Sequence, residues 1–366
     1  MRKIRVLEIS TVGIGVEGIT SVIKEYTRVI DKKKFQMYIL VTDNSNPTVV
    51  SEFRSIECEV CYFPSRKEKT IKYFWKLVAF IKKNKVDVVH VHGNSATITI
   101  ELLAALIGGA KGRIAHSHNT KCEAVVADSI LRPFFNKLYT DAIACSEGAG
   151  EWLFKRKDFI ILKNARNIDE FVYSSIYRGE TRKKLSIGDK IAIGHVGGFV
   201  EQKNHRFILE ICECIKKQKL NYKIFCAGEG CLMDKIIEES KKLQLQDYIE
   251  FVGNIDWMSE FICAMDVMIL PSLFEGLPLV TIEWQISGIP CLISDKITKE
   301  CAICNNIEFL PIDNCPEQWV ENIMHIDTNY DRGKKSYENA KKIQQKGFDI
   351  DIEKKKLEKI YLKYEK

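Results

Sequence analysis

The segment DVMILPSLFEGLPLVTIE, residues 266–283, has the pattern of a buried strand that passes through a tight turn into a helix. The apolar run at its start suits a strand covered on both faces of a parallel sheet. Pro278 suits the first turn of a helix, where its missing N–H group costs no hydrogen bond. Strand–turn–helix units of this kind build α/β folds.

The same unit is repeated on both sides of this segment. Short β-branched runs occur at 4–10, 37–42, 86–92, 113–118, 141–146 and 159–164, and again at 191–197, 222–228, 248–253, 266–272, 290–295 and 307–312. Helical patterns lie between most of them, as at 204–217, where apolar residues recur with a period near 3.6. The alternation predicts two doubly wound, Rossmann-like parallel sheets, with ligands bound at the carboxyl ends of the strands in the crevice between domains.

A chain of 366 residues is too long for one ordinary core, so two domains are expected. We predict an N-terminal domain over residues 1–172 and a C-terminal domain over 173–345. The polar stretch 172–189 suits a linker, and the lysine-rich end, about 346–366, suits a helix.

Composition and charge narrow the class of protein. With 46% apolar and 28% charged residues and no apolar run near the ~20 needed to cross a bilayer, the sequence indicates a cytoplasmic globular protein. The net charge of +6 comes without a nucleic-acid motif, so phosphorylated substrates or an anionic membrane explain it as well. The two CxxC pairs, Cys58/Cys61 and Cys301/Cys304, lie far apart, so we interpret the thirteen cysteines as reduced thiols and expect no zinc.

A glycine-rich loop follows the first predicted strand. Gly13, Gly15 and Gly18 form a literal GxGxxG, and Asp43 ends the second predicted strand, where a dinucleotide site places its ribose-binding acid. An NAD(P)-dependent enzyme is therefore one alternative. Two residues separate the strand from Gly13, however, whereas the dinucleotide fingerprint begins its turn at once.

Four histidines lie near the ends of two predicted strands. His90 and His92 form one i,i+2 pair and His116 and His118 the other, so each pair shares a face. No acidic residue is spaced to complete a metal shell with them, and we expect no metal. His90 and His116 are as readily structural as functional, while His118 is the stronger functional candidate because its strand should end at the cleft.

Two carboxylates and a lysine form the most informative constellation. Glu275 lies in the turn after a buried strand, and Glu283 lies in the helix that follows. A carboxylate can bind two neighbouring sugar hydroxyls, and the amides at a helix start can hold a phosphate. Lys203, which follows Gly197 and Gly198 after another strand, can neutralise a diphosphate, and Gly228 ends a third strand nearby.

The segment RKEKTIKYFWKLVAFIKKNK, residues 66–85, is basic and aromatic at helical spacing. It suits a helix on a membrane surface. It equally suits a helix of the first domain whose residues Phe74, Leu77, Val78 and Ile81 face the sheet, and the two interpretations are compatible.

These residues resemble the retaining glycosyltransferases of family 4, which have the two-domain GT-B fold, and most of all those that build bacterial capsular and exopolysaccharides. The resemblance spans nearly the whole chain. The separation of Glu275 and Glu283 by seven residues matches the EX7E signature of that family. The other matching segments are VHVHG (89–93), AHSHNT (115–120), ACS (144–146), LKNARNIDEF (162–171), GHVGGFVEQKNH (194–205), AGEG (227–230), FVGN (251–254) and the rest of 271–295.

The resemblance implies a role for each candidate residue. Lys203, near Gly197 and Gly228, would bind the donor phosphate, and the amides around Gly276, Leu277, Leu279 and Val280 would hold the diphosphate. Glu283 would bind the ribose and Glu275 the transferred sugar. Gly15 and Gly18 would approach donor and acceptor, His118 would line the reaction centre from the opposite domain, and the C-terminal helix would pack back on the first domain.

The implied reaction moves a hexose or N-acetylhexosamine, with retention and without metal or cofactor, from a UDP-sugar to a glycan or to an oligosaccharide carried on undecaprenyl diphosphate. It would occur at the inner face of the bacterial plasma membrane. Gly198 departs from the family, which usually has an arginine there; Arg206 is a possible substitute, and Ala165, Asn167 and Trp284 are lesser departures. The alternatives are a non-catalytic GT-B partner subunit, the NAD(P)-dependent enzyme and a sugar-nucleotide epimerase.

Overall fold

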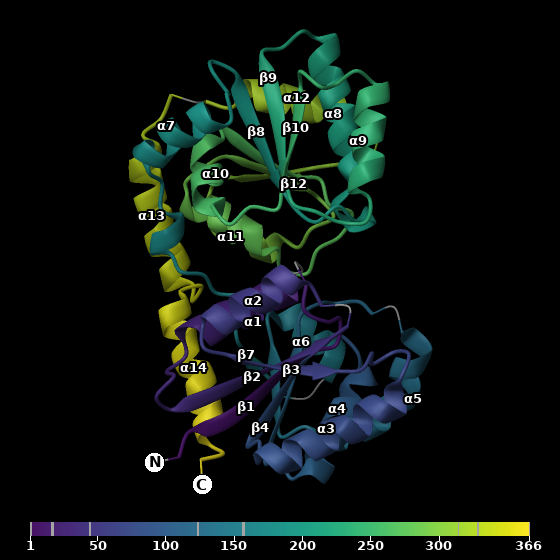
Figure 1. Cartoon of the computed structure of the whole chain (residues 1–366). Helices are drawn as coiled ribbons and strands as arrows, with labels where there is room; N and C mark the ends of the chain where they lie inside the picture. The colour runs from purple at the N-terminus through teal and green to yellow at the C-terminus, as the bar shows by residue number, and fades with distance from the viewer. Residues whose placement is uncertain are drawn as a thin grey trace. The chain divides into compact units, whose positions relative to one another are not determined.

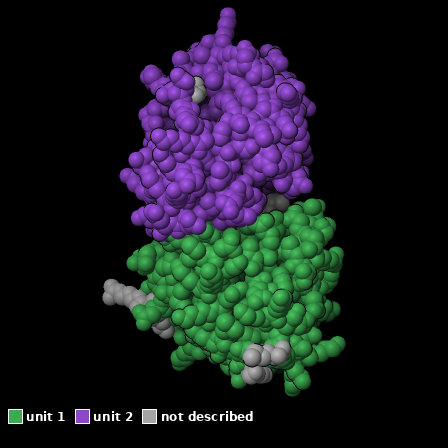
Figure 2. All heavy atoms as spheres, turned by 90° about the vertical axis from the view of Figure 1, so that its left-hand side faces the viewer, with its two compact units in different colours: residues 1–165, 347–366 green, residues 166–346 purple. Residues whose placement is uncertain are grey.

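The computed structural model describes residues 2–15, 18–43, 45–122, 124–155, 158–313, 315–327 and 329–365. Their contacts divide the chain into two units, coloured in Figure 2. Unit 1 comprises Met1–Ala165 and Gly347–Lys366, and unit 2 comprises Arg166–Lys346. The chain therefore passes from one unit to the other twice, after Ala165 and after Lys346.

Unit 1 is built on a parallel sheet of seven strands in the order β3-β2-β1-β4-β5-β6-β7 (Figure 1). The strands are β1 (Ile4–Ser10), β2 (Phe35–Thr42), β3 (Glu59–Phe63), β4 (Val88–His92), β5 (Gly112–Ser117), β6 (Asp141–Ala144) and β7 (Ile160–Ile161). Both faces of the central strands are covered: Val6, Leu7 and Ile9 of β1 are fully buried. That double burial explains why these strands read as continuous apolar runs.

Helices flank the sheet of unit 1. They are α1 (Gly18–Val29), α2 (Pro47–Ser55), α3 (Thr70–Asn84), the short η1 (Ala96–Ile98), α4 (Thr99–Gly108), α5 (Val125–Leu138) and α6 (Glu147–Phe154). The C-terminal helix α14 (Ile350–Leu362), yellow in Figure 1, packs against α1 and β1. In α3 the side chains of Tyr73, Leu77, Val78 and Ile81 are buried, so this helix does have a face directed at the core of unit 1.

Unit 2 contains a parallel sheet of six strands in the order β10-β9-β8-β11-β12-β13. The strands are β8 (Ile191–Val196), β9 (Tyr222–Ala227), β10 (Ile249–Gly253), β11 (Val267–Leu270), β12 (Cys291–Ser294) and β13 (Ile307–Leu310). The helices are α7 (Ser175–Lys184), α8 (His205–Lys217), α9 (Met233–Lys242), α10 (Met258–Ala264), α11 (Leu279–Ile286), α12 (Pro316–His325) and α13 (Arg332–Gln345), with the short helices η2 (Asp169–Phe171), η3 (Glu201–Lys203) and η4 (Lys299–Cys301).

The prediction of a linker over residues 172–189 is wrong, because this stretch contains α7, which packs on α10 within unit 2. The polar composition of this stretch suggested a solvated linker, but its charged side chains form ion pairs within unit 2. Arg178 and Arg182, one helical turn apart, reach the carboxylate of Asp266 at 2.5 and 3.0 Å. They also donate to backbone carbonyls at the end of α10. The division after Ala165 also lies seven residues before the boundary that we placed after residue 172.

All thirteen cysteines are free thiols, and nine of them are buried. Burial raises the pKa of Cys226 and of Cys291 far above the range of a reactive thiol. Among the helices that the structure describes, none combines the length and apolarity that a membrane span requires.

Candidate functional site

Glu275 lies in the loop that β11 delivers, at the carboxyl edge of the sheet of unit 2. Three donors converge on its carboxylate. Lys203 Nζ and Ser272 Oγ lie 2.6 and 2.9 Å from Oε1, and Gln202 Nε2 lies 3.0 Å from Oε2. The structure therefore brings together Glu275 and Lys203, two of the residues that the sequence analysis selected.

The loops after β8 and β11, which are neighbours in the sheet, are joined by one backbone hydrogen bond and one side-chain hydrogen bond. The N–H of Leu273 donates to the carbonyl of Gln202 at 2.9 Å, and Asn204 Nδ2 donates to the carbonyl of Pro271 at 3.2 Å. These two bonds hold the backbone beside Lys203 next to the loop that carries Glu275, so the two side chains start from fixed positions.

The glycines after β8 and β9 permit close approach of their loops. At Gly228, whose φ is +136°, a Cβ atom would lie 2.2 Å from the carbonyl oxygen of Gly197. A Cβ at Gly197 would lie 3.0 Å from Cδ of Lys203. At Gly198, by contrast, the nearest atom would be the carbonyl oxygen of Glu229 at 3.4 Å, an ordinary contact. Gly228 is therefore required by the backbone, whereas Gly198 is not.

Glu283 lies in α11 and is buried, and its Oε1 accepts a 2.6 Å hydrogen bond from Arg166 Nε. Sequence reasoning missed Arg166, although it lies inside the segment LKNARNIDEF that carried the resemblance.

Helix α11 begins without a side-chain cap. Pro278, which precedes it, has an extended backbone and supplies neither a cap nor an N–H group. Around this helix start Leu277 and Leu279 are buried, while Gly276 and Val280 are partly exposed. Uncapped amides at a helix N-terminus, with the positive end of the helix dipole, suit an anion such as a phosphate.

The glycine loop of unit 1 is described only in part, since residues 16 and 17 lie outside the described residues. Gly13 has a φ of +93°, and the N–H of Gly15 donates to Thr20 Oγ1 at 3.2 Å. Gly18 is the first residue of α1, and Asp43 is exposed after β2. The turn thus leads into a helix, as a Rossmann-like unit requires.

The four histidines lie together in unit 1, on β4 and at the end of β5, and the expectation that no acidic residue joins them is wrong. Glu8 of β1 is adjacent, because β1 pairs with β4 in the sheet. Its Oε2 lies 2.8 Å from His92 Nε2, and His92 Nδ1 lies 2.8 Å from His118 Nε2. His90 Nε2 lies 3.1 Å from His116 Nδ1. The missed signal was register: residues 82 positions apart along the chain, Glu8 and His90, are partners in the ladder.

Charge within this cluster resides on Glu8. Burial alone would raise the pKa of its carboxyl, but the interactions with His90 and His92 outweigh burial and hold the pKa well below its usual range. Burial, together with neighbouring histidines, lowers the pKa of His92 to about 4 and those of His116 and His118 further below 6.5. An ionised Glu8 carboxylate and neutral rings of His92, His116 and His118 are the expected state at pH 7.

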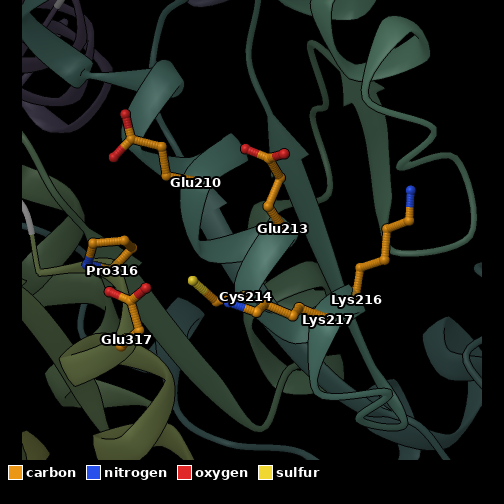
Figure 3. Close-up of a pocket in the computed structure, with 7 residues that line it drawn as sticks. All are labelled: Glu210, Glu213, Cys214, Lys216, Lys217, Pro316 and Glu317. Atoms are coloured by element: carbon orange, nitrogen blue, oxygen red, sulfur yellow. The ribbon is translucent and has the colours of Figure 1, made fainter.

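A surface hollow on unit 2 involves none of the predicted site residues. Figure 3 shows it between α8 and α12, lined by Glu210, Glu213, Cys214, Lys216, Lys217, Pro316 and Glu317. Burial and nearby carboxylates, chiefly that of Glu317, raise the pKa of Cys214 to about 11. The thiol is therefore a poor nucleophile, and the hollow carries no recognisable chemistry.

Comparison with known proteins identifies the class. Residues 178–343 match the family described as Glycosyl transferases group 1. EpsF of Bacillus subtilis (strain 168), described as a glycosyltransferase, is 32% identical over 310 residues, which cover 81% of this chain and 80% of EpsF. The chain belongs to the group 1 glycosyltransferases, which confirms the predicted glycosyltransferase family, while the assignment to family 4 and the retention of configuration stay predictions.

Other relatives indicate the kind of biosynthesis in which such glycosyltransferases act. The capsular polysaccharide biosynthesis glycosyltransferase CapH of Staphylococcus aureus is 22% identical over 90% of this chain and 91% of its own. A UDP-Gal:alpha-D-GlcNAc-diphosphoundecaprenol alpha-1,3-galactosyltransferase of Escherichia coli is 24% identical over 66% of each chain. The structure of Anabaena HepE in complex with UDP and glucose has a TM-score of 0.79 at 13% identity, over 97% of this chain and 98% of that one. The predicted GT-B fold is confirmed, and the chain is a glycosyltransferase of polysaccharide biosynthesis.

Proposed function

We propose that the protein transfers a hexose or N-acetylhexosamine from a UDP-sugar to a lipid-linked glycan, with retention of the anomeric configuration and without a metal ion. The observation that carries this proposal is the convergence of Lys203, Ser272 and Gln202 on the carboxylate of Glu275, beside an uncapped helix start. The E. coli relative, by its name, uses UDP-galactose and an undecaprenol-linked acceptor.

In this proposal Lys203 and the amides at the start of α11 stabilise the departing diphosphate. Preorganised charges of this kind act most strongly where charge develops in the transition state. Glu283, held in place by Arg166, accepts hydrogen bonds from the ribose hydroxyls, and Glu275 orients the transferred sugar. The glycines Gly15 and Gly18 of unit 1 would approach the donor and acceptor, and His118 would line the reaction centre.

A UDP-release assay with UDP-glucose, UDP-galactose and their N-acetyl counterparts tests the proposal. Turnover of one donor with an undecaprenyl-diphosphate glycan, unaffected by EDTA, is the expected result, and NMR of the product should show the anomeric configuration of the donor. A product with inverted configuration would contradict the proposed retention, and a strict metal requirement would contradict the proposed metal independence. Product analysis should also exclude isomerisation of the donor by an epimerase.

A non-catalytic partner subunit is the second candidate, and Gly198 in place of the usual arginine is the observation that favours it. Donor binding by calorimetry without turnover, even with glycan lipids present, would support this candidate. Binding of NAD(P) in the same experiment would revive the dinucleotide alternative; we expect none.

A membrane-facing surface on α3 belongs to the same proposal. Its outer side exposes Ile71 and Trp75, at 78% and 58%, among the lysines Lys72, Lys76, Lys82 and Lys83. Apolar anchors within a basic helix face suit an anionic bilayer. Sedimentation with phosphatidylglycerol vesicles should weaken strongly for Trp75→Glu and stay unchanged for Tyr337→Glu, a matched exposed aromatic on α13. Equal binding of both variants would contradict this surface.

A further inference from the structure

The buried cluster of Glu8, four histidines and Tyr361 lies in unit 1, and the resemblance assigns a role to His118 alone among its members. All six side chains are at least nine-tenths buried. Each forms a hydrogen bond with another member, and together they connect β1, β4, the end of β5 and the C-terminal helix α14. Buried polar groups organised this closely have a defined direction for every proton.

We propose that Glu8 and His92 are positioning residues that fix the tautomer of His118 and present its Nδ1 as a hydrogen-bond acceptor for a ligand hydroxyl. The proposal rests on the transferase function proposed above for the identity of that ligand, a sugar hydroxyl of donor or acceptor. The direction of the protons follows from the chain of contacts itself.

The first branch begins at the carboxylate, which can only accept. His92 Nε2, 2.8 Å from Glu8 Oε2, must therefore carry its proton, and in a neutral ring Nδ1 of His92 is then an acceptor. His118 Nε2, 2.8 Å from that atom, must donate. The neutral imidazole of His118 consequently has its lone pair on Nδ1, which makes no hydrogen bond with any described residue.

The second branch starts from the other oxygen of the same carboxylate. Tyr361 donates its hydroxyl proton to Glu8 Oε1 at 2.7 Å and accepts from His90 Nδ1 at 2.7 Å. His90 Nε2 is then the acceptor for His116 Nδ1. This branch ends at His116 Nε2, and His116 is only 1% exposed, whereas His118 is 8% exposed. The His90 branch therefore anchors α14, whereas the His92 branch ends at the more exposed of the two terminal rings, with His118 Nδ1 itself buried and without a hydrogen bond to a described residue.

A metal site is the rival explanation, because ring nitrogens of His90, His92 and His116 lie within 4.8 Å of one another. The rings argue against it. His90 is stacked on His92 with ring centroids 4.2 Å apart, and the members bond mainly to each other. Three imidazoles on one ion must instead direct their lone pairs at a common point about 2.0–2.1 Å away, which would require this network to break.

Nitrogen-15 NMR of histidine side chains in the full-length wild-type protein tests the relay without any ligand or variant. At pH 7 His118 should be neutral with its proton on Nε2. A proton on Nδ1, or a rapidly exchanging mixture, would overturn the proposal. Shifts of His90, His92 and His116 on addition of one equivalent of Zn²⁺ would overturn it in favour of a metal centre.

Kinetics then separate the two branches. His92→Phe keeps the stacked ring but removes both hydrogen bonds, so His118 should lose its single tautomer and kcat should fall at least tenfold with little change in KM for the donor. His90→Phe, the matched control, should keep the His118 signal and kcat within about threefold. Equal loss in both variants would overturn the proposal. If His92→Phe fails to fold, His118→Gln replaces it, because glutamine keeps a donor toward His92 but removes the Nδ1 acceptor. Its kcat should also fall at least tenfold, and an unchanged kcat would overturn the proposal.

This design separates the relay from the transferase function. A wild-type protein that neither binds nor turns over any UDP-sugar refutes the proposed function, while the NMR result still decides the tautomer. An active enzyme whose His118 carries its proton on Nδ1 refutes the relay alone.

Discussion

Arg166 Nε lies 2.6 Å from Glu283 Oε1, and the two side chains are only 5% and 8% exposed. Removing one partner from such a pair takes the opposite charge away from a buried ionised group, which costs about 3–5 kcal/mol. We therefore expect Arg166→Met to lower the free energy of unfolding of unit 2 by that amount in urea titrations.

Two controls make this prediction specific. Lys242→Met breaks a pair with Glu238 that is exposed on both sides, and it should leave the unfolding free energy unchanged. The double variant Arg166→Met with Glu283→Gln should recover part of the loss, because the second buried charge is removed as well. A loss below about 1 kcal/mol for the single variant would contradict the buried pair.

Lys203→Met should lower kcat with the best UDP-sugar by roughly 10²–10³-fold, the effect of removing one preorganised charge from a developing anion. Unfolding free energy should change much less, because Ser272 and Gln202 still hold the Glu275 carboxylate. The exposed Lys296, paired with Asp313, is the matched control, and Lys296→Met should retain full activity. Less than a threefold effect of Lys203→Met would remove this lysine from the proposed site.

The sequence predicted the central strands of both sheets well because they are buried on two faces and their apolar runs are bounded by polar residues. The edge strand β3 at Glu59–Phe63, where only Phe63 is buried, is absent from the predicted series of strands. β1 at Ile4–Ser10 was predicted without error, and β8 at Ile191–Val196 within one residue. The prediction of a linker over 172–189 was wrong because a charged helix and a linker have similar compositions. Only the position of Asp266 shows that Arg178 and Arg182 hold α7 in place.

In the candidate site, sequence spacing located residues that lie in one strand–turn–helix segment, as Glu275 and Glu283 do. Lys203, from a different segment, was selected from its position after a strand and from the family resemblance, but spacing could not locate the partners Glu8 and Arg166. Glu8 reaches His92 through strand register, and Arg166 reaches Glu283 from 117 positions away in the chain. Such pairs follow from topology, which a period of 2 or 3.6 does not encode.

Gly198→Arg should restore the cation that the family usually places there. The space at Gly198 accepts a Cβ at ordinary contact distance. A charge-assisted hydrogen bond to phosphate contributes about 1.5–3 kcal/mol, so the Kd for UDP measured by calorimetry should fall roughly 10- to 100-fold. Unchanged or weaker binding would show that another cation already fills this role, and Arg206, exposed at the start of α8, is the first to test.

Gly228→Ala is the contrasting substitution in the neighbouring loop. Its φ of +136° and the 2.2 Å approach to the carbonyl of Gly197 leave no room for a side chain. We expect a loss of at least 1–3 kcal/mol in the free energy of unfolding, about the strain of one disallowed backbone conformation. A stable Gly228→Ala protein would show that the loops after β8 and β9 can separate without harm to the fold.

His205 makes the stability of unit 2 sensitive to acid. Its ring is 3% exposed and stacks on Phe199 with centroids 3.9 Å apart, and neither ring nitrogen bonds to any described residue. Burial, and then the charge of Lys203, lower the pKa of His205 to about 4 from 6.5. Between these two values the unfolded chain binds a proton that the folded chain does not, so stability is lost as the pH falls from about 6.5 to 4.

Replacing His205 by phenylalanine removes both the buried polar atoms and this proton. His205→Phe should therefore be more stable than wild type at pH 7, and its advantage should grow by about 2 kcal/mol at pH 5, since the unfolded variant has no imidazole to protonate. Urea titrations at the two pH values measure the difference, and His325→Gln, an exposed histidine on α12, should show no such growth. An advantage that is constant with pH would mean that His205 takes up its proton equally in the folded and unfolded chains.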